Sequence, residues 1–173
     1  MRRALPAVGL LGTGLAVHGA AQALRLRRAR TAARARLAGR PVRTATLDHG
    51  DVAYIDRGPG RERTGETILS VHGLYGGYDQ ALDNVGSLSA HCRIIAPSRF
   101  GYPGSAVRGD GSPANQAAVF AALLDRLAIE RVFVLGASAG GTPAIRFALD
   151  HPERVSGLIL LSSAAPWPSR PAT

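Results

Sequence analysis

A pentapeptide of small residues, Gly136-Ala137-Ser138-Ala139-Gly140, constrains the fold of this chain more than any other feature. It lies directly after the apolar run 132–135 and begins a helix predicted over 139–149. A serine at a tight strand-to-helix turn adopts strained backbone angles, and its neighbours two positions away must be small so that strand and helix can approach. Such a turn exposes the Ser138 hydroxyl beside a helix N-terminus, where negative charge is stabilised. Taken alone, the pattern also fits a serine that only caps a helix.

A second glycine-rich segment favours chemistry at Ser138 over a simple cap. Residues 72–77 read His-Gly-Leu-Tyr-Gly-Gly and follow a short apolar run at 67–71, which is typical of a buried strand. A glycine-rich loop at the carboxyl end of a strand can turn a backbone N–H toward the serine hydroxyl. Together with the N–H of Ala139, such a donor would form an oxyanion hole.

The segments around these two motifs alternate between strands and helices. We expect a β-hairpin from 42–47 and 52–56 around a His49-Gly50 turn. Ser112 is the expected N-cap of a helix with Pro113 in its first position. The remaining predicted strands cover 67–71, 93–96, 132–135 and 158–161, and the helices cover 78–90, 113–127 and 139–149. This alternation predicts βαβ units and a mostly parallel sheet flanked by helices.

The charge divides the chain into two parts. The net charge is +9, from 21 Arg and 12 acidic residues with no Lys. Residues 1–43 carry ten Arg and no acid, whereas residues 44–173 have a net charge of −1. We therefore predict an Arg-rich leader over 1–43 and a folded domain over 44–173. A hydrophobic content of 46% excludes a disordered or fibrous chain, and the single Cys excludes an intrachain disulfide and a cysteine-based zinc site.

The leader contains a 21-residue stretch, 4–24, without a formal charge. As a helix it would be about 30 Å long, enough to cross a bilayer. One alternative is an uncleaved anchor that keeps the folded domain in the cytoplasm. Another is a secretory signal cleaved near Ala21-Gln22-Ala23, and a third is a peripheral segment. If the segment stays next to the membrane, the arginines of 25–40 would touch anionic lipid. Binding of nucleic acid is disfavoured, because this segment has no aromatic residue for base stacking.

From about Val42 to Pro168 the sequence resembles the α/β-hydrolase fold superfamily, in its branch with a serine nucleophile. The matching segments follow one another in the same order along the chain. They are Ala53–Gly58, Leu69–Gly73, Ile95–Tyr102, the Gly-Ala-Ser-Ala-Gly-Gly turn at 136–141, His151–Val155 and Leu158–Leu161. The resemblance implies an α/β fold whose first six strands, with the N-terminal hairpin, are present here. The uncharged stretch 4–24 adds a predicted N-terminal apolar helix.

The resemblance also implies a site and a reaction. Ser138 would be the nucleophile, and the backbone N–H groups of Ala139 and Leu74 would bind the oxyanion. The supporting residues would be His72, Gly73, Gly136 and Gly140. The substrate would be a small-molecule carboxylic ester or amide, cleaved through an acyl-enzyme, with no metal and no cofactor. Ser98 stands where many relatives carry a structural Asp.

The family's acid and base, which follow the serine in the chain, have no clear counterpart here. Beyond Ser138 only Asp150, His151 and Glu153 are acids or histidines. Asp150 and His151 lie at the far end of the predicted helix, about 18–20 Å from Ser138. We interpret His72 as a brace of its loop rather than as the base. The sequence thus looks like the N-terminal half of a serine hydrolase, and the alternative is a catalytically inactive, truncated or relict protein tethered to a membrane.

Overall fold

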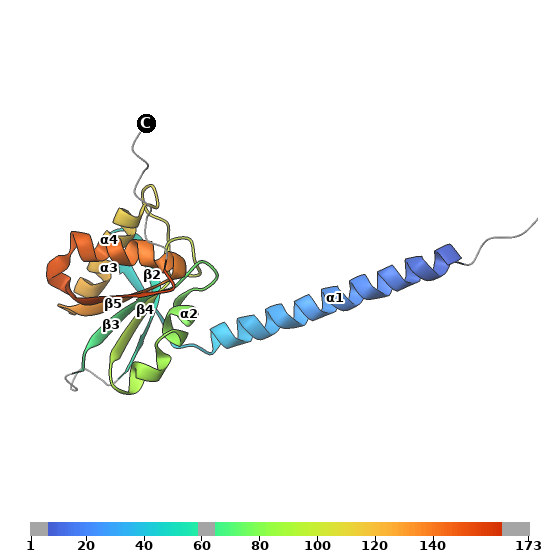
Figure 1. The fold of residues 1–173 in the computed structure, drawn as a ribbon, viewed down its shortest axis with the longest axis horizontal. Coiled ribbons are helices and arrows are strands. Elements are labelled where there is room, and N and C mark those ends of the chain that lie inside the picture. The colour runs from blue at the N-terminus through green and yellow to red at the C-terminus, as the bar shows by residue number, and fades with distance from the viewer. Residues whose placement is uncertain (1–6, 59–64, 164–173) are drawn as a thin grey trace, which may run out of the picture. The chain divides into compact units, whose positions relative to one another are not determined.

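The chain divides into two units, with the boundary between Arg40 and Pro41. The computed structural model describes residues 7–58 and 65–163, with side chains from residue 16 onward (Figure 1). Residues 1–6, 59–64 and 164–173 lie outside the described part of the chain.

The first unit consists of a single long helix, α1 (Ala7–Ala38). The helix continues through the arginine run and ends just before Gly39. Within the described residues, no helix has a stretch both long and apolar enough to cross a membrane. The membrane-spanning helix predicted over 4–24 is therefore not found over 7–24, since four glycines with His18 and Gln22 dilute its apolar residues.

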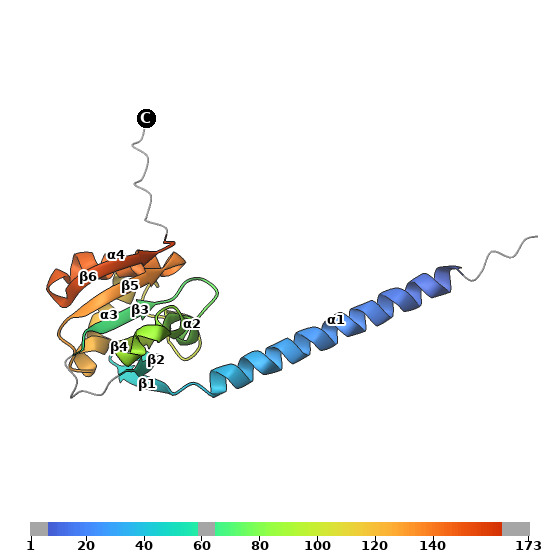
Figure 2. The same cartoon turned by 60° about the horizontal axis from the view of Figure 1, so that its bottom comes forward.

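The second unit is built on a six-stranded sheet. Its strands are β1 (Val42–Leu47), β2 (Gly50–Arg57), β3 (Thr67–Val71), β4 (Arg93–Pro97), β5 (Val132–Ala137) and β6 (Val155–Leu161). Figure 2 shows their order, β1-β2-β4-β3-β5-β6. The pairs β3–β4, β3–β5 and β5–β6 are parallel, whereas β1–β2 and β2–β4 are antiparallel. The prediction of a mostly parallel sheet with an N-terminal hairpin is confirmed.

Three α-helices cover the two faces of this sheet: α2 (Tyr78–Asp83), α3 (Pro113–Arg126) and α4 (Gly141–Asp150). The Ser112 hydroxyl caps α3, as predicted, by accepting the N–H of Asn115 at 3.3 Å. In Figure 1, α3 and α4 lie together on one side of the strands and α2 lies on the other. The flanking helices predicted for an α/β fold are thus confirmed.

Alternation along β3 explains why both faces need a helix. Leu69 and Val71 are fully buried in the core cluster that also holds Phe120 of α3 and Phe147 of α4. Ser70 points to the opposite face, where its hydroxyl donates to the carbonyl of Ala81 in α2 at 2.7 Å. Because β3 is buried on both faces, its carboxyl end is held firmly in the sheet. The loop that begins at His72 therefore starts from a fixed position.

The hairpin turn and the helix predicted over 78–90 differ from the structure. The hairpin turn is Asp48-His49 rather than His49-Gly50, because Leu47 pairs with Gly50, which begins β2 at a φ of +106°. The helix predicted over 78–90 is also interrupted: α2 ends at Asp83, and a 3₁₀ turn, η1 (Gly86–Ala90), follows. Asn84 and Gly86 are weak helix formers, and they stop the helix although the apolar spacing continues.

Candidate active site around Ser138

Ser138 occupies the turn between β5 and α4. It begins the 3₁₀ turn η2 (Ser138–Gly140), so the helix predicted from Ala139 begins as a 3₁₀ turn before α4. The φ of Ser138 is +50°, and the residue is exposed. A non-glycine residue in the left-handed region costs about 1–2 kcal/mol, so the surrounding structure must hold it there. The strained, exposed serine that the pentapeptide predicts is present in the structure.

The two glycines of the pentapeptide let the chain segments around Ser138 approach closely. A Cβ at Gly136 would lie 2.7 Å from the Cβ of Ala144 and from the Cα of Gly141, so strand and helix could not pack. A Cβ at Gly140 would collide with the carbonyl oxygens of Val71 and His72. The contacts of Gly140 bring the turn of Ser138 against the end of β3, where the second glycine-rich loop begins.

The loop after β3 lies beside Ser138. A Cβ at Gly73 would lie 3.2 Å from the Cβ of Ser138, so Gly73 packs directly against the serine. The Leu74 side chain is exposed, and Ala139 is half-buried next to Ser138. The structure therefore brings together, at the carboxyl edge of β3 and β5, the segments predicted to carry the nucleophile and the two oxyanion donors.

His72 is fully buried at the start of this loop. Its Nε2 accepts the backbone N–H of Arg99 at 2.9 Å, so the ring proton is on Nδ1, which donates to the carbonyl of Gly73 at 2.8 Å. Burial lowers the pKa of His72 to about 4, and the positive charge of Arg99 adds to this effect. Because both ring nitrogens are occupied, His72 braces its loop and has no free nitrogen to offer to Ser138.

The other candidate partners beyond Ser138 are engaged elsewhere. The carboxylate of Asp150 accepts from Nε of Arg146 at 2.7 Å, one turn earlier in α4. His151 packs against Phe147 with ring centroids 5.2 Å apart, and its Nδ1 lies 4.0 Å from Glu153. Among the described residues, no histidine forms a hydrogen bond with the Ser138 hydroxyl. Asp150 and His151 are thus at the far end of α4, as predicted.

Several contacts around the site involve residues that the sequence did not single out. The Gly73 N–H donates to Oε1 of Gln80 at 2.9 Å, and the Tyr102 hydroxyl donates to the carbonyl of Leu74 at 2.6 Å. The hydroxyl of Ser163 donates to the carbonyl of Ser138 at 2.8 Å. Tyr102 was visible only as part of the segment 95–102, and nothing in the sequence around Gln80 or Ser163 marks these residues.

Comparison with known proteins agrees with this geometry. The family model described as "alpha/beta hydrolase fold" matches residues 66–172. The chain belongs to the α/β-hydrolase fold family. The uncharacterized hydrolase YcgS of Bacillus subtilis is 36% identical over 124 residues, which are 72% of this chain and 42% of that protein. The chain therefore spans less than half the length of this relative.

Two solved structures extend the comparison to the fold. An α/β-hydrolase fold protein from Nakamurella multipartita is 34% identical, with a TM-score of 0.63 over 70% of this chain and 41% of the other. A membrane phospholipase A, described as a bacterial virulence factor, is 27% identical, with a TM-score of 0.67 over 93% of this chain and 53% of the other. The second match extends over a larger share of this α/β-hydrolase-fold chain than the first.

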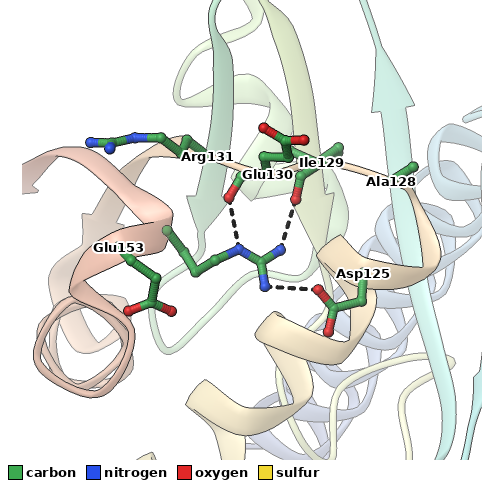
Figure 3. Close-up of a pocket in the computed structure, with 7 residues that line it drawn as sticks. Asp125, Ala128, Ile129, Glu130, Arg131 and Glu153 are labelled. Carbon is green, nitrogen blue, oxygen red and sulfur yellow. Dashed lines mark hydrogen bonds and ion pairs between the residues drawn. The ribbon is translucent and has the colours of Figure 1, made fainter.

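An open hollow of about 500 Å³ lies beside the amino-terminal ends of β5 and β6 (Figure 3). Ser138, in contrast, follows the carboxyl end of β5. The hollow is lined by Asp125, Ala128, Ile129, Glu130, Arg131, Glu153 and Arg154, which precede the starts of β5 and β6. Arg154 donates to Asp125 and to the carbonyls of Ile129 and Glu130, each at 2.7 Å. The guanidinium of Arg154 is thus bonded to other residues of the fold. The described residues contain no cluster of three or more metal-ligand side chains, here or near Ser138.

Proposed function

We propose that Ser138 is the nucleophile of a hydrolase that cleaves a carboxylic ester or amide through an acyl-enzyme. The observation that carries the proposal is the exposed Ser138 at a φ of +50°, between a buried strand and a helix, with Gly73 packed against it. The backbone N–H groups of Leu74 and Ala139 are proposed as the oxyanion donors. Gly136 and Gly140 support the site by permitting the close approaches described above.

The proposed reaction has two steps. The Ser138 oxygen attacks the carbonyl carbon and gives its proton to a base, while the carbonyl electron pair moves onto oxygen and is bound by the two N–H groups. The tetrahedral species collapses, the alcohol or amine leaves with a proton, and an acyl-enzyme remains. Water then attacks the acyl carbon and releases the carboxylic acid and the free serine.

The general base is not found among the described partners of Ser138, since both nitrogens of His72 are occupied. The competing proposal is therefore a catalytically inactive member of the family. An oxyanion hole without a base still retains part of a serine hydrolase's rate, about 10³–10⁴-fold over water. Slow labelling of Ser138 by a reactive probe is consequently expected even without the base.

A fluorophosphonate probe tests this proposal on the full chain. We expect the probe to label Ser138, identified by mass spectrometry of the modified peptide. Ser138→Ala should abolish labelling, and Ser87→Ala, a change at an exposed serine in η1, should leave it intact. If the folded wild-type chain takes up no probe at Ser138, even slowly, the nucleophile proposal is wrong.

A lipid ester at an anionic membrane surface is a second candidate substrate. Its support is the structural match to a membrane phospholipase A, which covers 93% of this chain. Seven arginines follow Leu24 up to Arg40, and those within α1 are exposed. Each arginine near an anionic membrane contributes about 1 kcal/mol of attraction. We propose that residues 25–40 contact anionic lipid headgroups.

Sedimentation with vesicles tests the lipid contact. The full chain should sediment with phosphatidylglycerol vesicles and remain in solution with phosphatidylcholine vesicles, and about 0.5 M salt should release it. Replacing the arginines of 25–40 by Gln should abolish sedimentation, whereas replacing Arg57 and Arg108, outside this segment, should not. Equal sedimentation with both lipids, or equal binding to duplex DNA, would contradict the proposal.

A further inference from the structure

The exposed half of the loop 72–75 is held by hydrogen bonds from side chains rather than by packing. Leu74 is 56% exposed and Tyr75 is 95% exposed, so the tip of the loop buries little apolar surface. Three consecutive peptide groups of the loop are nevertheless bonded to side chains. A peptide group is planar, so fixing one of its atoms by a hydrogen bond restricts where the other points.

The first peptide group joins His72 and Gly73. Its N–H donates to Oε1 of Gln80 in α2, and its carbonyl accepts Nη1 of Arg99 at 3.1 Å. The second group joins Gly73 and Leu74, and its carbonyl accepts Nδ1–H of His72. Because a trans peptide directs its N–H away from its C=O, this bond sets the direction of the Leu74 N–H.

The third peptide group joins Leu74 and Tyr75, and its carbonyl accepts the Tyr102 hydroxyl at 2.6 Å. Tyr102 is itself held in place. Its ring meets the His72 ring edge-on, with centroids 4.5 Å apart and planes at 73°, and the Arg99 guanidinium lies 5.5 Å from the ring centroid. Tyr102 thus reaches the loop from the segment after β4, whereas Gln80 reaches it from α2.

One backbone donor of this loop is left open. The Leu74 N–H has no hydrogen bond to another described residue, although the carbonyl of its own peptide group and both flanking peptide groups are bonded. The geometry points to Gln80 and Tyr102 as the positioning residues of the Leu74 N–H, since they fix the peptide groups on either side of it. This inference rests on the proposed function, in which the Leu74 N–H binds the oxyanion.

The test compares the rate of fluorophosphonate labelling at Ser138 between variants of the full chain. In that reaction an Oγ–P bond forms and the P–F bond breaks, while the hydroxyl proton passes to the buffer and fluoride leaves. Tyr102→Phe deletes one hydroxyl and keeps the ring contacts. Gln80→Leu deletes the acceptor of the Gly73 N–H. The matched controls are Tyr75→Phe, at the exposed tip of the same loop, and Gln22→Leu in α1.

We expect Tyr102→Phe and Gln80→Leu each to lower the labelling rate at saturating probe by about 5- to 10-fold, as the loss of one positioning hydrogen bond predicts. The half-saturating probe concentration should not change, because the oxyanion donor acts on the transition state rather than on initial binding. Both controls should label at the wild-type rate. A merely structural role would lower Tm and leave the rate of the folded fraction unchanged, and that result overturns the inference.

Amide hydrogen exchange keeps the inference testable apart from activity. The Gly73 amide, which is bonded to Gln80, should exchange faster in Gln80→Leu and Tyr102→Phe than in the controls, and Gln80→Glu, which keeps an acceptor, should preserve its protection. If the wild-type chain is not labelled at Ser138, the proposed function fails. Amide exchange then tests the positioning role by itself. Faster exchange in the two variants than in the controls supports that role, and equal exchange overturns it.

Discussion

The backbone N–H of Arg99 points at the ring of His72, 2.9 Å from Nε2. This bond ties together the segments that follow two neighbouring parallel strands, because His72 comes directly after β3 and Arg99 comes two residues after β4. A ring protonated on Nε2 cannot accept this bond. The folded state around Ser138 therefore requires a neutral His72.

The first prediction concerns pH. The pKa of His72 is lowered from 6.5 to about 4, chiefly by burial, so the unfolded chain binds a proton between these values and the folded chain does not. Stability is therefore lost as the pH falls from about 6.5 to about 4, on the order of 3 kcal/mol for this group. A titration of the His72 ring protons by NMR should give a midpoint near 4.

The control for this prediction is the exposed His91. Urea unfolding of His91→Gln should show the same loss of stability between pH 7 and pH 4.5 as the wild-type chain, whereas His72→Gln should show a smaller loss. A His72 midpoint near 6.5 would contradict the structure, because it would require a ring that is open to water.

The second prediction concerns Gly140. A methyl group there would collide with the carbonyl oxygens of Val71 and His72, and this end of β3 cannot move without disturbing its pairing with β5. We expect Gly140→Ala to lower the free energy of unfolding by about 3 kcal/mol or more. The matched control is Gly86→Ala, where a Cβ meets nothing within 4 Å and stability should change by less than about 1 kcal/mol. Chemical denaturation measures both, and similar losses in the two variants would refute the prediction.

These glycine contacts show which part of the site could be predicted from the sequence. The turn at Ser138 depends on residues within two positions of the serine, and only small side chains there allow the strand and the helix to meet. The sheet could be predicted for a similar reason, because short apolar runs alternating with helices leave few topologies. Both predictions rest on patterns that are local in the chain.

Contacts between loops that are distant in the chain have no local sequence pattern, so they could not be predicted. Tyr102 and Leu74 are 28 residues apart, and their bond depends on how the segment after β4 packs on the loop after β3. The helix predicted over 78–90 shows that a sequence pattern can also mislead. The spacing of Leu82 and Val85 fits a continuous helix, but Asn84 and Gly86 end it. The hydrogen bonds of Arg154 cannot be predicted from the sequence either, because two of their acceptors are backbone carbonyls, which carry no sequence signal.

The third prediction concerns Arg154, which holds the segment before β5 against the start of β6. Arg154→Ala leaves the carbonyls of Ile129 and Glu130 without their donor, and we expect a loss of about 1–3 kcal/mol in unfolding free energy. Asp125→Asn should cost less than about 1 kcal/mol, because that carboxylate is 66% exposed and an amide oxygen can still accept. Equal losses in the two variants would assign the effect to the ion pair instead.

The fourth prediction concerns β6, the last strand in the order of the described sheet. Leu158, Ile159, Leu160 and Leu161 are each between 39% and 46% exposed. An apolar strand at a sheet edge promotes association with other chains. Ile159→Lys should therefore reduce concentration-dependent association, measured by sedimentation velocity. Val107→Lys places the same charge on an apolar loop residue that is 61% exposed, and it should have a smaller effect.

The fifth prediction separates the strain at Ser138 from its chemistry. Both Ser138→Ala and Ser138→Gly remove the hydroxyl, so neither variant should be labelled by a fluorophosphonate. Glycine adopts a φ of +50° without the steric penalty of alanine, so Ser138→Gly should be more stable than Ser138→Ala by about 1 kcal/mol. Ala128 has a φ of +51° on the surface far from the site, and Ala128→Gly should gain a similar amount. If the glycine and alanine variants of Ser138 unfold at the same urea concentration, the turn is not strained, and the close packing around Gly136 and Gly140 does not serve to hold a strained serine.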